Sequence, residues 1–411
     1  MPLCSKARKP CSIVEKYCLP NITALSKSLI VLLAATSALG PGAMQVLLPA
    51  LPVIRETFAV STQVAQLTLS LSMLAIAMGA LVYGPLSDKY GRKPVMIMGL
   101  IITLAGSLFC YIASSIEMLI LGRIVQAFGG AVGLVLARAI ARDVYGPGEA
   151  ARIIATLVMV MVVIPMFSPA LGGELMARFG FESVFLAVGL LTTLILLFVT
   201  LRLPETLHTP VAFKGIGSML FTFVELLRSR AFCGYAFCVT FVSVVFFTFI
   251  SAAPEIMVSV FNRPPTEYGY YFVMVPLGFI SGNYVARRCG THVELNTMIR
   301  CGAAIAVAGI SLAIVLQLIG LNQPLALFAP VAIAIFGNGI TLPNAQAAAI
   351  NEFPQFAGSA SGLTGFLQMS FSAAAAQLVA VIYNGTVFPL LVLMLGAAVL
   401  SLVSFLLGVG K

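Results

Sequence analysis

The sequence predicts an all-α polytopic membrane protein. Its 411 residues are 60% hydrophobic and only 9% charged, whereas soluble globular domains carry about 25% charged residues. Apolar runs of about 20 residues, the length that spans the hydrocarbon core of a bilayer, recur along the whole chain. Because the backbone in lipid must satisfy its own hydrogen bonds, these runs are expected to be helices.

Twelve spans are expected in order along the chain. They lie near 29–51, 64–86, 94–114, 118–140, 153–177 and 182–201, and then near 231–253, 268–286, 298–319, 324–347, 358–382 and 387–408. Their glycines and prolines are no objection, since membrane helices tolerate both residues. The spans form two six-helix halves, 29–201 and 231–408, behind an N-terminal tail (1–28) and joined by a linker (202–230). Two such halves are typical of transporters with internal repeats.

The lysines and arginines predict the orientation. With the N-terminus in the cytoplasm, all but four of the 23 fall on the cytoplasmic side or at cytoplasmic helix ends; the exceptions are Arg55, Arg123, Arg178 and Arg263. Both termini are therefore expected inside. The formal net charge of +9 reflects this topology and gives no reason to expect a nucleic-acid partner. In the linker, the amphipathic stretch "FKGIGSMLFTFVELLRSR" predicts a helix on the membrane surface.

No residue pattern favours catalysis, a metal or another cofactor. Cys4, Cys11 and Cys18 are spaced by seven residues, which is not a usual metal-ligand spacing. His208 and His292 lie in predicted loops, and no paired acids or Ser/His arrangement accompanies them. An enzyme is therefore not expected.

A short island of charge, "GPLSDKYGRKPV" (84–95), lies in the predicted turn between spans two and three. A basic cytoplasmic loop explains its cations but not Asp88 or the glycines at 84 and 91. Gly84, Leu86, Asp88, Gly91, Arg92 and Lys93 match G-x-L-x-D-x-x-G-R-K. This island resembles the loop signature of the major facilitator superfamily.

Two further motifs strengthen the resemblance. In span four, Arg123, Gln126 and Gly129 match the pattern R-x-x-Q-x-x-G. In span five, "IPMFSPALGG" (164–173) is similar to the antiporter motif, with Ser168 where the commonest form has Gly. The stretches "LLPALPVIRETF", "VAQLTLSLSM" and "VLARAIARDVYG" resemble Bcr/CflA-type drug exporters. The resemblance implies proton-coupled export of small amphipathic drugs by alternating access, in a bacterial inner membrane, with the protein acting as a monomer.

The resemblance also assigns the island a role as a cytoplasmic gate. Arg92 is expected to pair with Asp143, and Asp88 to face the N-terminus of span eleven at "FPQFAGSASG". A carboxylate at a helix N-terminus gains about 0.3–1 kcal/mol, enough to bias a conformation yet weak enough to release. The predicted gate residues are Gly84, Asp88, Gly91, Arg92, Lys93 and Asp143.

Two features inside the membrane leave alternatives open. Arg123 costs about 2.5–3.5 kcal/mol at mid-bilayer, so it is expected to face a partner or a cavity. It either joins helices through Gln126 and backbone carbonyls or influences proton and substrate binding. In span five, small residues and prolines indicate either ordinary packing or a bent, tightly packed helix that prevents leak; these residues are Pro165, Ser168, Pro169, Gly172 and Gly173.

The chain departs from the resemblance at a key position. Bcr/CflA-type exporters carry an acid in span one, in a pattern like D-x-Y-L-P-A-x-P, and this chain has Gln45 there. Glutamine does not exchange protons near neutral pH, so either Glu174, Glu255 or Asp88 titrates, or the coupling differs from the usual scheme of the family. The alternative is a facilitator or importer of a small metabolite without proton coupling.

A substrate cavity is expected to be apolar with a few amides. Polar groups of this kind among methionines and phenylalanines suit an uncharged or amphipathic organic molecule. The candidates are Gln45, Asn338, Asn344 and Gln346, together with Gln126.

Overall fold

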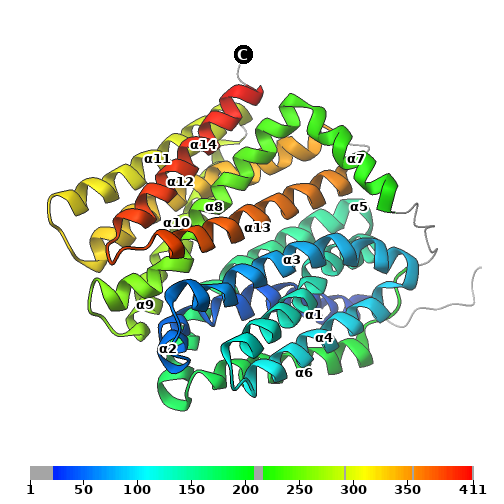
Figure 1. Cartoon of the computed structure of the whole chain (residues 1–411). Helices are drawn as coiled ribbons and strands as arrows, with labels where there is room; N and C mark the ends of the chain where they lie inside the picture. The colour runs from blue at the N-terminus through cyan, green and yellow to red at the C-terminus, as the bar shows by residue number, and fades with distance from the viewer. Residues whose placement is uncertain (1–21, 208–215, 291–292, 354–355, 410–411) are drawn as a thin grey trace, which may run out of the picture.

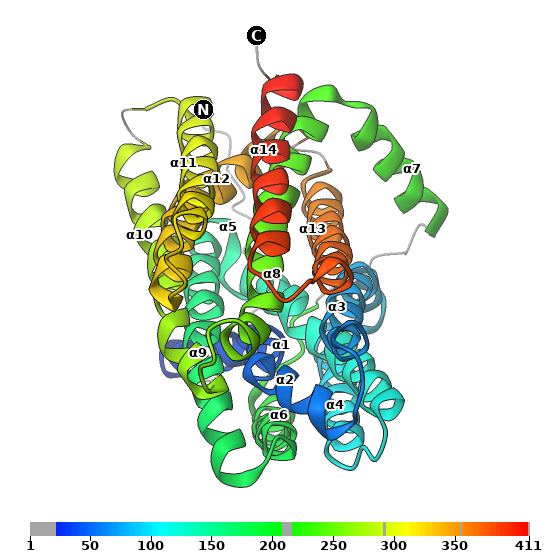
Figure 2. The ribbon, with the colours of Figure 1, turned by 60° about the vertical axis from the view of Figure 1, so that its left-hand side comes forward.

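The structure, a computed structural model, describes residues 22–207, 216–290, 293–353 and 356–409. Most of the predicted tail, with Cys4, Cys11 and Cys18, lies outside these residues, as do His208 and His292. Figures 1 and 2 show that the described chain is a bundle of long helices. The predicted all-α membrane fold is confirmed.

The helices follow one another with short connections. The first half contains α1 (Ile22–Gln45), η2 (Leu48–Ala50), α2 (Leu51–Thr57), α3 (Thr62–Tyr90), α4 (Arg92–Tyr111), α5 (Ile116–Phe179) and α6 (Glu182–Arg202). After the amphipathic helix α7 (Ile216–Arg228), the second half contains α8 (Arg230–Ser259), α9 (Pro265–Phe272), α10 (Met274–Cys289), α11 (Leu295–Leu318), α12 (Pro324–Asn351), α13 (Ala357–Ile382) and α14 (Phe388–Val409). Within the described residues, 11 segments are long and apolar enough to cross a membrane.

The first predicted span, 29–51, lies within one segment that can cross a membrane, Ser28–Thr57, but this segment is not a single helix. Helix α1 begins at Ile22, inside the predicted tail, and ends at Gln45. The chain then continues through η2 and α2, each of which has a proline in its first two positions. Pro49 and Pro52 lack the N–H that an uninterrupted helix needs, whereas the start of a new helix tolerates them. The proline run therefore divides the first span.

Predicted spans four and five belong to one continuous helical stretch, α5, which must reverse its direction. Arg123 Nη1 donates to Ala43 O, and a Cβ on Gly172 would lie 1.9 Å from Val46 O. Both ends of α5 thus lie beside the same end of α1, although 49 residues of straight helix would separate them by about 74 Å. The segments Ile116–Tyr145 and Met159–Phe179 each suffice to cross a membrane, as predicted for two spans.

Predicted span eight, 268–286, is divided between α9 and α10 at Val273. Pro276 explains the break, because its ring nitrogen cannot donate to the carbonyl of Phe272, four residues earlier. Together α9 and α10 cover the predicted range, although neither alone is long enough to be counted as a span. This pair supplies the twelfth crossing of the expected fold.

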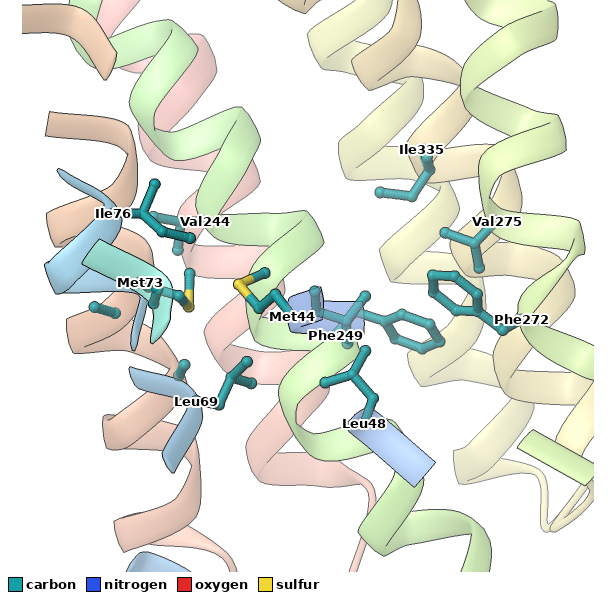
Figure 3. Close-up of a cluster of buried hydrophobic side chains, with 14 of the residues drawn as sticks. Met44, Leu48, Leu69, Met73, Ile76, Val244, Phe249, Phe272, Val275 and Ile335 are labelled. Atoms are coloured by element: carbon teal, nitrogen blue, oxygen red, sulfur yellow. The ribbon is translucent and has the colours of Figure 1, made fainter. Parts of the chain in front are cut away.

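The two halves meet along a buried apolar cluster. Figure 3 shows Met44, Leu48 and Met73 from the first half facing Val244 and Phe249 on α8; these side chains are at most 5% exposed. Helices α3 and α13 also lie side by side across the boundary, as do α5 and α9. The halves are therefore in contact through apolar side chains in the middle of the molecule.

Candidate functional site

The charged island lies almost entirely within helices, so the predicted turn between spans two and three is shorter than the spans at 64–86 and 94–114 implied. Helix α3 continues to Tyr90 and α4 begins at Arg92, so Gly91 alone separates them. Gly91 has a φ of +99°, and a Cβ there would lie 2.6 Å from Glu205 Oε2. The left-handed backbone favours glycine, and a larger residue would also push the Glu205 carboxylate aside. At Gly84 a Cβ would make only an ordinary contact with Val135.

Arg92 is the centre of the ionic network at this end of the bundle, which we call the Arg92 end. Its Nε lies 2.9 Å from Asp143 Oδ2, so it joins α4 to α5. Its Nη1 donates to Ser87 Oγ and to Asp88 Oδ1, each at 2.6 Å. The Arg92–Asp143 pair matches the expectation. Among the described residues Asp88 contacts Arg92, whereas its expected contact with the start of span eleven is not found.

Glu205, which the sequence reasoning missed, caps the start of α4. Its carboxylate accepts hydrogen bonds from the backbone N–H groups of Arg92 (2.9 Å) and Lys93 (3.1 Å). It also accepts from the N–H groups of Thr206 and Leu207. Partial burial raises the pKa of Glu205, but these four N–H donors outweigh that effect and lower the pKa below its ordinary 4.5. Glu205 therefore binds the first turn of α4 as an anion.

Replacing Glu205 by alanine is expected to destabilise the protein by about 1 kcal/mol, the usual cost of losing a helix cap. Since folding lowers this carboxyl pKa, the contribution is complete above pH 4.5 and is lost as the pH falls through the folded value. Unfolding measured in detergent at several pH values tests both points. Glu225→Ala, which removes an exposed carboxylate on α7, is the control; equal stability of the two variants would contradict the capping role.

Arg123 lies deep in the first half, with 2% of its surface exposed. Its Nη1 donates to Ala43 O and to Gln126 Oε1, while Gln126 donates onward to Ser107 Oγ at 2.8 Å. Its Nε has no hydrogen-bond partner. Arg123 also lines a cavity of about 10 Å³, together with Gly40, Ala43, Met44, Ile76, Thr103, Gln126, Ala127 and Gly130. It therefore both joins helices and faces a space about the size of one water molecule.

A second arginine on α5, Arg138, points inward as well, although the sequence placed it at a cytoplasmic helix end. It is half-buried, and its Nη2 lies 3.9 Å from Met161 Sδ, on the returning part of α5. Its Nε is buried without a hydrogen-bond partner. The side-chain burial of Arg138 follows from the reversal of α5, which no sequence pattern revealed.

The antiporter-like stretch packs tightly against α1. Pro165, Ser168 and Pro169 are buried, and Ser168 Oγ donates to Ile164 O at 2.9 Å. Gly172 leaves no room for a side chain beside Val46 O. At Gly173 a Cβ would meet Thr266 Cα at an ordinary 3.4 Å. This stretch thus combines a close contact within the first half with a looser contact to the second.

Polar bonds join the two halves at the opposite end of the bundle, which we call the Arg55 end. Arg55 Nη1 on α2 forms an ion pair with Glu255 on α8, whose surface is 7% exposed. Gln377 on α13 accepts from Ser70 Oγ at 2.9 Å and donates to Gln63 O at 3.0 Å. Tyr270 on α9 also donates to Glu174 on α5 at this end.

Glu174 also takes part at the Arg55 end, but in a more exposed place. It accepts from Arg178 Nη2 and from Tyr270 Oη, both at 3.2 Å. A second small cavity is lined by Leu51, Arg55, Thr62, Ala65, Gln66, Ser251 and Glu255. Of the two carboxylates proposed for proton exchange here, Glu255 is the buried one that holds the halves together.

The predicted amides of the substrate cavity are not brought together. Gln45 is buried and its Oε1 has no partner, whereas Asn338 Nδ2 donates to Val242 O at 3.3 Å. Asn344 donates to Ile340 O on its own helix, and Gln346 is half-buried. None of these four lines either cavity described above.

Comparisons with known proteins agree with this fold. A family model described as Major Facilitator Superfamily matches residues 33–377. An uncharacterized MFS-type transporter of Bacillus subtilis is 30% identical over 91% of this chain and 93% of its own length. A bicyclomycin resistance protein homolog of Haemophilus influenzae is 28% identical, over 92% and 94% of the two chains. The fold is similar to that of a bacterial homolog of the lysosomal transporter Spinster, with a TM-score of 0.73, 16% identity and coverage of 93% and 96%.

Proposed function

The chain belongs to the Major Facilitator Superfamily, and we propose that it is a secondary transporter that exports small amphipathic compounds by alternating access. The observation that carries this proposal is the distribution of bonds between the halves. Polar bonds join them at the Arg55 end, while the Arg92 network stays within the first half. Such an arrangement fits one state of a carrier whose halves rock about a central site.

The orientation and cellular setting follow from the positive charges. We place the Arg92 end in the cytoplasm of a bacterial inner membrane, because most lysines and arginines cluster there. The same charges put both termini inside. We take the working unit to be the monomer, since each chain contains both halves and the boundary between them.

Protons are proposed to drive the export, and Glu255 is the leading carboxylate for this role. It is buried, and it pairs with Arg55 across the boundary between the halves. Other polar groups nearby include Arg55, Glu56 and Gln66, and the hydroxyl of Ser259 bonds both Glu255 O and the hydroxyl of Tyr383. Protonation of Glu255 would remove the ion pair with Arg55, so the protonation state of Glu255 is coupled to the closure of the Arg55 end. Glu174 and Asp88 are more exposed and remain secondary candidates.

Gln45 favours a second candidate function, uncoupled facilitation or import of a small metabolite. The side chain at this position in span one is buried and its Oε1 has no partner, but an amide does not exchange protons at neutral pH. A carrier that lacked any titrating group in the pathway would follow the gradient of its substrate alone.

Uptake into everted membrane vesicles distinguishes the two candidates. We expect a labelled amphenicol or a related amphipathic compound to accumulate, and a protonophore to abolish the accumulation. In vesicles that contain the Glu255→Gln variant, uptake of the compound is expected to be the same with and without the protonophore. Uptake that ignores the protonophore in the wild type would remove proton coupling and favour facilitation. Absence of uptake for every amphipathic compound would contradict the export proposal.

A further inference from the structure

Two arginines on α5 carry positive charge into the interior of the first half. Arg123 and Arg138 are 15 residues apart, which places them about 22 Å apart along a helix and about 60° apart around it. Each has an Nε without a hydrogen-bond partner. Both guanidiniums stay charged at any physiological pH.

No carboxylate of the described residues lies within ion-pair distance of either arginine. Arg123 relies instead on neutral acceptors, the carbonyl of Ala43 and the amide of Gln126. Gln45, two residues after Ala43 in the sequence, is likewise uncharged and has a buried Oε1 without a partner. Since a buried charge is costly unless an opposite charge pairs with it, this region lacks one negative charge.

The small cavity beside Arg123 reaches the boundary between the halves. Two of its lining residues, Met44 and Ile76, belong to the apolar cluster where the halves meet, and Figure 3 shows both beside Met73 and Val244. At about 10 Å³ the cavity holds a water molecule but no organic group. It widens only when the halves part, which is the motion that alternating access requires.

We propose that Arg123 forms part of a binding site for an organic anion, so that the transported compounds include amphipathic molecules with a carboxylate or a similar single negative charge, and these bind more tightly than uncharged ones. The anionic group pairs with the free edge of the Arg123 guanidinium, and the apolar part lies against Met44, Ile76 and Met73. Arg138 lies nearer the Arg92 end and attracts the anion as it moves from that end toward Arg123. This inference rests on the proposed transport function and specifies its substrate class.

Three probes with one ring system test the charge preference directly. The full-length protein in detergent is dialysed against 2-naphthoate, 2-naphthamide or 2-naphthylmethylammonium, which differ in charge and share the naphthalene. The chain has no tryptophan, so naphthyl fluorescence is read without that background. We expect the wild type to bind the carboxylate at least about tenfold more tightly than the other two, as a charge-assisted hydrogen bond predicts.

Variants assign the preference to its residue. Arg123→Gln is expected to bring the affinity for 2-naphthoate down to that for 2-naphthamide, while Arg123→Lys keeps the preference. Arg178→Gln, at an exposed arginine that pairs with Glu174, is the matched control and keeps it too. If Arg123→Gln does not fold, the three probes on the wild type still test the charge preference, and Arg123→Lys and Arg138→Gln test its location: Arg138→Gln is expected to weaken binding of 2-naphthoate alone.

Equal affinities for the three probes, tighter binding of the cation, or absence of 2-naphthoate binding at millimolar concentration would overturn the proposal. So would a carboxylate preference that survives both Arg123→Gln and Arg138→Gln. Dialysis needs no gradient and no transport, so its result is independent of the vesicle experiment. If the vesicles show no uptake but dialysis shows the preference for the carboxylate, the export proposal is refuted and the anion site is retained.

Discussion

Gly172→Ala is expected to destabilise the protein by about 1–3 kcal/mol, the usual cost of forcing extra volume into a packed interior. A Cβ on Gly172 would lie 1.9 Å from Val46 O, a distance that no side-chain rotation relieves because the obstacle is backbone. Either α1 or the returning part of α5 must move. The readout is thermal unfolding in detergent, together with the yield of folded protein.

The adjacent glycine provides a matched control. At Gly173 the nearest atom to an added Cβ is Thr266 Cα at 3.4 Å, an ordinary contact, so Gly173→Ala is expected to unfold near the wild-type temperature. Both variants make the same change to helix propensity on the same helix. Equal stability of the two would show that α1 and α5 do not pack as closely as the structure places them.

Sequence patterns predicted the helices well because hydropathy reports burial in lipid directly. They failed at helix boundaries that depend on a single backbone hydrogen bond. Pro49, Pro52 and Pro276 divide two spans that hydropathy treats as continuous. In the charged island a turn of several residues was expected between the spans, yet Gly91 alone turns the chain and Glu205 satisfies the N–H groups that follow. Composition cannot show such a remote cap, since Glu205 lies 113 residues from Arg92.

The candidate site shows the same division. The motif residues Arg92 and Asp143 form an ion pair, as the resemblance implied. A motif shared by a family can predict such a contact, because its members keep the same helices side by side. Arg138 and the Arg55–Glu255 pair depend on how α5 reverses and how the two halves meet. Those relations arise from tertiary packing, and a periodic pattern along one helix carries no information about them.

Asp88→Asn is expected to reduce transport by about tenfold or more while it changes stability little. In the structure the Asp88 side chain is 45% exposed and pairs with Arg92, and an exposed pair of this kind contributes about 0.2–1 kcal/mol. Arg92 keeps its bond to Asp143 in the variant, so the fold of this end persists. We propose that Asp88 acts in the other state of the transport cycle, when the Arg92 end closes and its carboxylate meets the N-terminus of α13.

That closed state depends on the charge of Asp88. A carboxylate in a partly buried place at a helix N-terminus gains up to about 2 kcal/mol, and 1.4 kcal/mol already changes an equilibrium tenfold. An amide keeps the shape of Asp88 but loses this attraction, so the Arg92 end closes too seldom for turnover. Vesicle uptake and thermal unfolding, measured on the same preparations, separate the two effects, with Glu225→Gln on α7 as the control. Full transport by Asp88→Asn would show that the gate closes without this charge. If the variant instead unfolds so readily that the loss of folded protein accounts for the loss of transport, Asp88 is only a structural partner of Arg92.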